Sequence, residues 1–286
     1  TGPFGDELIP GSYLSRFAFL GWLFLFLKIK KHKNLFYLSI IYFSIVGVTI
    51  FATGERMALA TYMLGLVFLS LFYKNKRILF IGSLIITLFF IFLANKLHPI
   101  YNDYKILEST PYHLGLKVEK TFSCENQESK QCYKVILLQP KFTEVLRKFN
   151  QSAYGEIYNL GLTMFKDHKL FGIGLNNFNF LCNNDIRYNN VMKNYSCVSH
   201  PHNIYLQWLV EAGIIGLFLF IFYLFYLFYF IIKTGSNVYS LIAITSMISL
   251  FWPIMSTGSL LKNWNGISVF FIVGICILLS KFKKSA

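Results

Sequence analysis

Charged side chains are scarce in this sequence of 286 residues, and acidic ones are the scarcest. Asp, Glu, Lys and Arg make up 14% of the chain, against about 25% in soluble globular domains. Hydrophobic residues make up 55%, which argues against an ordinary soluble domain. A helix needs about 20 mainly apolar residues to cross a bilayer. Several stretches meet this condition, so the sequence predicts an all-α polytopic membrane protein.

Motifs for nucleotides and metals are also lacking. The chain has no Walker motif and no G-x-G-x-x-G, and its cysteines lack the C-x-x-C spacing of zinc sites. The sequence therefore implies no cofactor and no metal. It has neither an initiator Met before Thr1 nor a signal-peptide pattern, so we expect it to be the C-terminal fragment of a longer chain.

The net charge of +14 raises the question of nucleic-acid binding, and the positions of the charges argue against it. Eleven basic residues lie in four short segments that contain no Asp or Glu: 28–33, 74–77, 233 and 281–284. Basic loops without acidic residues mark the cytoplasmic side of a membrane protein. The partners predicted from this pattern are membrane lipids, with no nucleic acid.

The apolar stretches predict seven membrane spans, which alternate between the two sides of the membrane. They cover residues 16–27, 35–52, 57–73, 78–94, 203–232, 238–252 and 267–279. The predicted organisation is four spans within 1–94, a hydrophilic loop domain at 95–201, and three spans within 202–286. The fifth stretch is longer than a bilayer requires, and its two glycines, Gly213 and Gly216, allow a bend or close packing.

The hydrophilic region 95–201 holds 13 of the 27 basic residues, 9 of the 13 acidic ones and four of the five cysteines. Disulfides persist in the bacterial periplasm, so cysteine placement and charge agree on a periplasmic loop. Three pairings are open. Cys124–Cys132 and Cys182–Cys197 each close a short loop and are favoured; four free thiols are the alternative. Residues 141–149 and 153–165 have helical spacing of apolar residues.

Residues 199–217, SHPHNIYLQWLVEAGIIGL, place a histidine at the start of the fifth apolar stretch. His202 and Asn203 are followed by nine residues and then by Gly213-Ile-Ile-Gly216. This spacing resembles that of the bacterial O-antigen ligase family, which shares a domain with O-antigen polymerases. Arg56 in TGERMALA resembles the family's arginine at an outer membrane edge, with Ala60 where a Leu is usual. HKLFGIGLNNF (168–178), residues 3–17 and 256–264 are similar too.

The resemblance implies a membrane glycosyltransferase with a GT-C-like helical bundle. Such an enzyme moves a glycan from undecaprenyl diphosphate to a hydroxyl of lipid A–core oligosaccharide. The implied site faces the periplasm from the bacterial inner membrane, and the implied reaction is metal-independent and inverting.

Two residues carry the implied chemistry. A histidine titrates near neutral pH, so His202 would act as the base for the acceptor hydroxyl. Arginine forks two N–H groups onto phosphate oxygens, so Arg56 would bind the diphosphate; an interfacial Arg that only reaches the headgroups is the alternative. Asn203 is expected to cap a helix and His200 to support the loop. Glu55 is expected to be solvated, with a role in orienting Arg56 as the alternative.

The family usually has a second phosphate-binding arginine in the loop, and the choice here is open. Arg147 lies in an amphipathic stretch before the helix that carries GEIYN and is preferred to Arg187. Lys141 or Lys148 would serve as point charges instead.

Three other functions stay open. An O-antigen polymerase and a protein O-oligosaccharyltransferase use the same donor with different acceptors. A transporter for lipid-linked sugars is the third. Transporters tend to have broken or charged spans near the bilayer midplane, whereas these spans are almost free of charge and their polar groups gather at one edge.

Overall fold

The computed structural model describes residues 9–29, 31–97, 105–107, 116–123, 131–138, 149–193, 195–235, 238–254, 256 and 258–282. For the strands and for His32, Asn95 and Gln151 only the backbone is described. The helices of the amino-terminal part are α1 (Pro10–Lys28), α2 (His32–Ala52), α3 (Arg56–Phe72), the 3-10 turn η1 (Lys74–Lys76) and α4 (Arg77–Leu97). The carboxyl-terminal helices are α10 (Ile204–Thr234), α11 (Val238–Leu250) and α12 (Asn263–Lys281).

These seven long helices correspond to the seven apolar stretches. Four of them are long and apolar enough to cross a membrane within the described ranges: Lys33–Ala52, Lys74–Ala94, Ile204–Thr234 and Asn263–Lys281. Arg56–Phe72 and Val238–Leu250 are shorter apolar helices. The chain is therefore a polytopic helical membrane protein, as the composition predicted. Helix α1 begins at Pro10, which suits a first helical position because its missing N–H has no partner there anyway.

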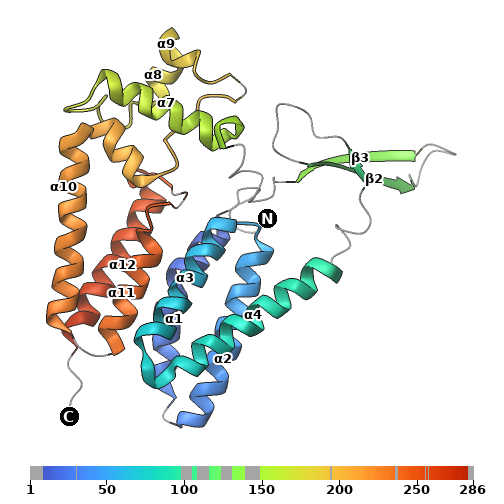
Figure 1. Cartoon of the computed structure of the whole chain (residues 1–286), viewed down its shortest axis with the longest axis vertical. Coiled ribbons are helices and arrows are strands. Elements are labelled where there is room, and N and C mark those ends of the chain that lie inside the picture. The colour runs from blue at the N-terminus through green and yellow to red at the C-terminus, as the bar shows by residue number, and fades with distance from the viewer. Residues whose placement is uncertain are drawn as a thin grey trace.

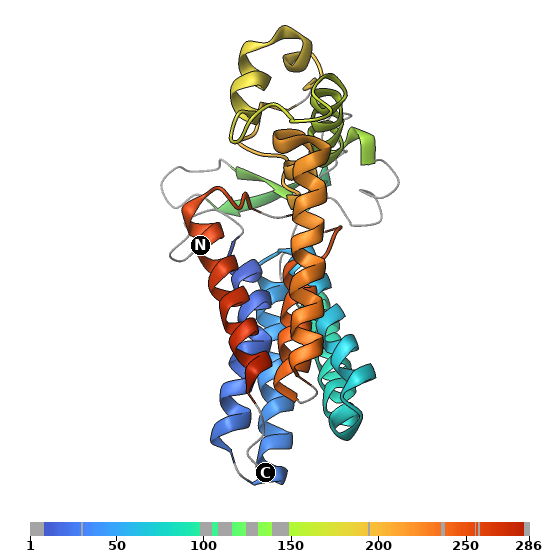
Figure 2. The ribbon, with the colours of Figure 1, turned by 90° about the vertical axis from the view of Figure 1, so that its left-hand side faces the viewer.

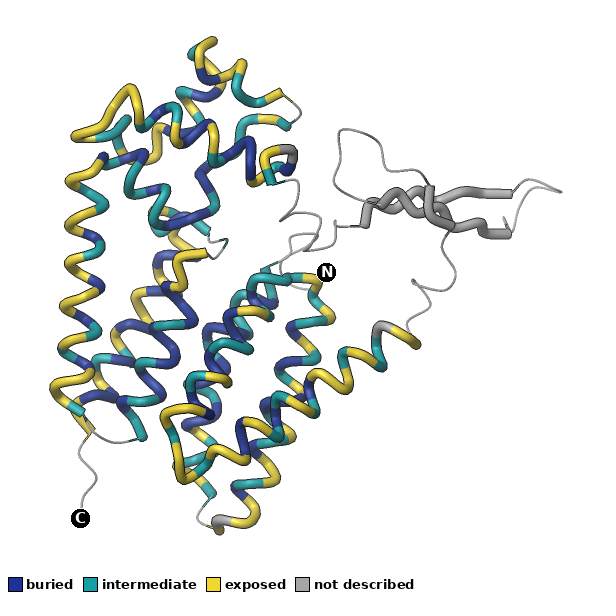
Figure 3. Tube along the Cα trace, in the orientation of Figure 1, coloured by how far each residue is buried: buried dark blue, intermediate teal, exposed yellow. Residues whose placement is uncertain are grey.

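The helices pack as one bundle, with α11 in contact with α1, α3 and α12, and α2 in contact with α4 (Figure 2). Aromatic side chains fill the centre: Phe19, Trp22, Phe43, Tyr62 and Phe80 are fully buried. Many residues along α4 and the long part of α10 are exposed (Figure 3), and most of the large ones are apolar. Such surfaces are stable against lipid tails rather than water.

The region between α4 and α10 combines a sheet with short helices. Strands β1 (Lys105–Leu107), β2 (Leu116–Ser123) and β3 (Gln131–Leu138) form an antiparallel sheet in the order β1-β2-β3. The remaining elements are η2 (Phe149–Gln151), α7 (Ala153–Asp167), α8 (Phe178–Asn184) and α9 (Ile186–Asn189). Helix α7 confirms the helix predicted at 153–165. The helix predicted at 141–149 falls almost wholly outside the described residues, and the sequence analysis did not predict the sheet.

Helix α10 is broken at Gly213, the position where the sequence allowed a bend. Gly213 has φ 69° and ψ −167°, a backbone conformation open essentially only to glycine. A short section, 204–212, therefore meets the long section, 214–234, at a sharp angle at the upper end of α10 (Figure 1). A straight helix of 31 residues would measure about 46 Å, well beyond a hydrocarbon core of about 30 Å. The long section alone matches the core.

The backbone groups released by this break are satisfied by the segment 169–174. The N–H groups of Ile173 and Gly174 donate to the carbonyls of Val210 and Glu211, both at 3.0 Å. In the other direction, the N–H of Ile214 donates to the carbonyl of Lys169 at 2.9 Å. Unpaired backbone groups are costly away from water, so this exchange stabilises the break and ties the loop region to α10.

Glycine is required at the break for space as well as for conformation. A Cβ on Gly213 would lie 2.2 Å from the carbonyl oxygen of Leu170. A Cβ on Gly216 would lie 2.2 Å from the Cβ of Ala212. The two motif glycines thus let the short section and the loop segment approach the long section.

We expect Gly213→Ala to lower the free energy of unfolding by about 2–3 kcal/mol, because Ala at this position combines backbone strain with a steric clash. Thermal unfolding of the purified protein in detergent measures the effect. Gly274→Ala is the matched control, since nothing lies within 4 Å of a Cβ added there and Ala favours a helix by about 0.5–1 kcal/mol. Equal unfolding temperatures for the two variants would contradict the role assigned to Gly213.

Candidate active site

Arg16, Glu55, Arg56, His202 and Lys262 lie toward one end of the bundle, which we call the histidine end. It carries the first residues of α1, α3, α12 and the short section of α10, together with the last residues of α2, α4 and α11. The opposite end, the lysine end, carries the clusters that contain Lys28, Lys74, Lys233 and Lys281. Helix α7 lies beyond the histidine end (Figure 1).

Asn203 fixes the start of α10 at the histidine end. Its Oδ1 accepts from the N–H groups of Tyr205 and Leu206, both at 3.0 Å, which confirms the predicted helix cap. Its Nδ2 donates to the carbonyl oxygen of Pro253 at 2.8 Å, in the loop after α11. The cap thereby joins the short section of α10 to the α11–α12 loop.

His202 precedes this cap in the left-handed region of backbone space, with φ 54°. Such a conformation is uncommon for a residue with a side chain, and it is over-represented at active sites. The imidazole lies 4.2 Å from the ring of His200 and 6.0 Å from the ring of Tyr154, measured between ring centroids. Within the described part of the chain, no group donates to or accepts from its ring nitrogens in a hydrogen bond, so the ring can reach a substrate.

The surroundings keep this imidazole neutral. Burial lowers the pKa of His202 below its ordinary value of 6.5, and the positive charge of Lys262 lowers it further. His202 is thus in its basic form at neutral pH.

His200 is buried and belongs to a chain of polar side chains behind His202. Its Nδ1 shares a hydrogen bond of 2.9 Å with the Ser199 hydroxyl, and Lys262 donates to the same hydroxyl at 3.0 Å. The sequence analysis gave His200 a supporting role and overlooked Lys262, because nothing in a single lysine of the α11–α12 loop indicates which histidine it will approach.

Arg56 occupies the first position of α3 at the histidine end, where it is half-buried.

The neighbouring Glu55 was expected to be solvated, and this prediction is wrong. Its carboxylate accepts from the N–H groups of Gly11 at 2.6 Å and Ser12 at 3.0 Å, and from the Ser12 hydroxyl. These are the free N–H groups of the first turn of α1, which a carboxylate stabilises. Glu55 therefore joins α1 to α3.

The histidine end contains a hydrogen-bonded pair, Arg16 and Asn265, to which the sequence analysis gave no function. Arg16 on α1 is buried and donates from Nη1 to Asn265 Oδ1 on α12, at 2.7 Å. Asn265 in turn donates from Nδ2 to the carbonyls of Gly258 and Ser259 at 2.8 and 3.1 Å. Arg16 had a signal in the sequence, since it is a charge beside an apolar run, but it was interpreted as the edge of a span.

The loop region also confirms a predicted disulfide. Cys182 and Cys197 form a disulfide, whereas the pairing of Cys124 with Cys132 falls outside the described residues. Arg147, the preferred candidate for a second phosphate contact, lies outside them as well, as do the alternatives Lys141 and Lys148.

Arg187, the less favoured candidate for that contact, is described and exposed. It makes a bidentate hydrogen bond to Asp185, from Nε to Oδ1 at 3.1 Å and from Nη2 to Oδ2 at 2.7 Å. A second acid, Asp167, lies 3.8 Å from its Nη1. Two carboxylates already occupy this guanidinium at the surface of the loop region.

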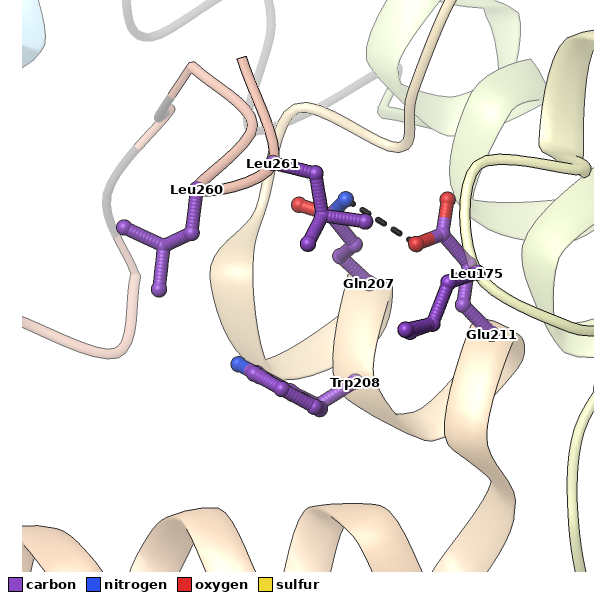
Figure 4. Close-up of a pocket in the computed structure, with 6 residues that line it drawn as sticks. All are labelled: Leu175, Gln207, Trp208, Glu211, Leu260 and Leu261. Carbon is purple, nitrogen blue, oxygen red and sulfur yellow. Dashed lines mark hydrogen bonds between the residues drawn. The ribbon is translucent and has the colours of Figure 1, made fainter. Parts of the chain in front are cut away.

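A small pocket lies beside the break in α10. It is lined by Leu175, Gln207, Trp208, Glu211, Leu260 and Leu261 (Figure 4). Gln207 Nε2 donates to Glu211 Oε2 at 3.1 Å and to the Ser259 hydroxyl at 2.7 Å. The second of these bonds links the short section of α10 to the α11–α12 loop. The pocket has a volume of ≈ 10 Å³, about enough for one water molecule, and is too small for a sugar. The described residues contain no group of three or more His, Cys, Asp or Glu that could hold a metal ion.

A bundle that contains several helices long and apolar enough to cross a membrane defines the class as a multi-pass membrane protein. The model of the O-antigen ligase family matches residues 41–221, more than half of the chain, and the chain belongs to this family. Comparison with curated proteins gives no match.

We expect Lys262→Met to raise the pKa of His202, because the variant removes a positive charge that disfavours the imidazolium. Lys262→Arg keeps the charge and should leave this pKa unchanged. The pH dependence of His202 acylation by diethylpyrocarbonate, followed by mass spectrometry, measures the pKa without any substrate. The same titration midpoint in both variants would show that Lys262 does not act on His202.

Proposed function

We propose that this protein transfers a glycan from undecaprenyl diphosphate to a hydroxyl of lipid A–core oligosaccharide, at the periplasmic face of the bacterial inner membrane. The observation that carries the proposal is the placement of the motif histidine. His202 is held neutral, by burial and by Lys262, at the bundle end where Arg56 begins α3. The family match supports the class of reaction.

The proposed reaction is a single displacement at the anomeric carbon. His202 removes the proton of the acceptor hydroxyl as that oxygen attacks. The bond between the anomeric carbon and the phosphate oxygen breaks, and its electron pair leaves with undecaprenyl diphosphate. One displacement inverts the configuration of the anomeric carbon. In this proposal the positive charge of Arg56 stabilises the leaving diphosphate in place of a metal ion.

Arg56 is proposed to stabilise the leaving diphosphate. Its place at the first position of α3 lets a phosphate meet the guanidinium at a helix amino terminus, where the helix dipole favours an anion. Electrostatic stabilisation is strongest where water is excluded, as at the edge of a bilayer.

The proposed face follows from the two ends of the bundle. The basic clusters lie at the lysine end, which the positive-inside rule places in the cytoplasm. The histidine end then faces the periplasm, where the Cys182–Cys197 disulfide is compatible with an oxidising environment.

We expect His202→Ala to lower the transfer rate by about 100- to 10,000-fold, the usual contribution of a positioned base. The assay uses purified protein in liposomes with a lipid-linked glycan, and offers lipid A–core or a second lipid-linked glycan as acceptor. His168→Ala, which changes an exposed histidine at the end of α7, is the control and should be as active as the original protein. Near-normal transfer by His202→Ala would remove the base assignment, and transfer only to the second lipid-linked glycan would indicate a polymerase.

Arg56→Lys should lower the same rate by about tenfold or more, because a lysine keeps the charge and loses the two-pronged contact with phosphate. Arg77→Lys, at the lysine end, is the matched control. If both variants transfer glycan at the original rate, Arg56 only anchors the helix at the interface.

A further inference from the structure

The histidine end carries more positive than negative charge, and one of its cations, Arg16, has no role in the proposed reaction. Only three of the 27 basic residues lie outside the four basic segments and the region 95–201: Arg16, Arg56 and Lys262. All three are at the histidine end. In the described part of the bundle, outside 95–201, the carboxylates are those of Glu55 and Glu211. Each already accepts a hydrogen bond from the protein, Glu55 from α1 and Glu211 from Gln207.

Arg16 is the most deeply placed of the three cations. It lies six residues after the start of α1, about 9 Å along the helix axis, and is 4% exposed. Its hydrogen bond goes to a neutral amide, Asn265 Oδ1. The ion pairs found among the described residues are both formed by Arg187, so Arg16 has no ion pair there.

A buried guanidinium that is hydrogen-bonded to a neutral amide is able to bind an anion. It has five N–H donors, and Asn265 accepts from one of them. Buried charges are normally paired, so a buried guanidinium whose hydrogen bond goes to a neutral amide is a place where a ligand anion can bind. Glu55 attracts Arg16 electrostatically, but its oxygens are held by the first turn of α1.

Asn265 holds the guanidinium in place. Both hydrogen bonds of its Nδ2 go to backbone carbonyls of the α11–α12 loop, which fixes Oδ1 as the atom that faces Arg16. The carboxylate of Glu55 places Arg16 relative to Arg56. Glu55 precedes Arg56 in the chain and binds Gly11 and Ser12, one turn of α1 before Arg16.

We propose that Arg16 binds the diphosphate of the lipid-linked donor together with Arg56, and that Asn265 is its positioning residue. This assignment rests on the proposed function. It gives the diphosphate two guanidiniums from α1 and α3, each able to bind two phosphate oxygens. The histidine end then recognises the donor lipid by its charge, within the membrane bundle itself.

The test is the affinity of the purified full-length chain for undecaprenyl diphosphate without a glycan, in detergent. We expect Arg16→Gln to weaken binding by about 10- to 100-fold and Arg16→Lys by less, as expected for the loss of charge-assisted contacts. Arg77→Gln, at the lysine end, is the matched control and should bind as the original protein does. Binding at the original affinity by a folded Arg16→Gln or Arg16→Lys variant would overturn the proposal.

Thermal unfolding separates a binding role from a structural one. A buried cation without an ion pair costs stability in the ligand-free protein, so Arg16→Gln should unfold at the same or a higher temperature than the original chain. A lower unfolding temperature, or loss of the folded protein in both variants, would assign Arg16 to the fold and overturn the proposal.

Two further experiments test whether Arg16 distinguishes a diphosphate from another lipid phosphate, and whether a negative result concerns Arg16 or the proposed function. In the first, phosphatidylglycerol replaces undecaprenyl diphosphate; an equal loss of affinity for both lipids in Arg16→Gln would show a general headgroup contact and overturn the diphosphate assignment. In the second, the unmodified protein is tested alone. If it does not bind undecaprenyl diphosphate, the proposed function fails; if it binds and Arg16→Gln binds equally well, only the inference on Arg16 fails.

Discussion

The break in α10 at Gly213 is the constraint on which the histidine end depends. A single helix from Ile204 to Thr234 would carry His202 far beyond the bilayer edge. The break turns the short section aside, and the backbone of residues 169–174 satisfies the groups that it releases. Asn203 then joins the start of this section to the loop after α11. A positive-φ glycine, a backbone exchange and a helix cap thereby fix where the imidazole lies.

The same end of the bundle holds Arg16, Glu55, Arg56, Glu211 and Lys262, whereas the basic clusters lie at the lysine end. Charge inside a bilayer is tolerated where it is paired or faces a polar cavity, so the placement of these charges at the two ends of the bundle has an energetic reason. Glu55 secures α1 to α3, Asn265 joins Arg16 to the α11–α12 loop, and Lys262 reaches the histidines through Ser199. The loop between α11 and α12 is therefore the common support of the candidate base and of Arg16.

The sequence predicted those parts of the fold that depend on local pattern. Apolar runs indicated the helices of the bundle, short cysteine spacing indicated the Cys182–Cys197 disulfide, and the residue type of Asn203 indicated its cap. Contacts between distant segments were not predictable in this way. Glu55 was taken as solvated because its partners, Gly11 and Ser12, lie more than 40 residues earlier. Arg16 was interpreted as a span edge because its partner Asn265 lies at the other end of the chain.

The central claim is that a lipid diphosphate binds at the histidine end of the bundle. An experimental structure of the full chain in lipid nanodiscs, with undecaprenyl diphosphate bound, tests this most directly. The account predicts that the diphosphate lies at the amino termini of α1 and α3, within hydrogen-bonding distance of Arg56, with the imidazole of His202 facing the same cavity. A diphosphate bound at the lysine end, or one separated from His202 by the bundle, would contradict the account.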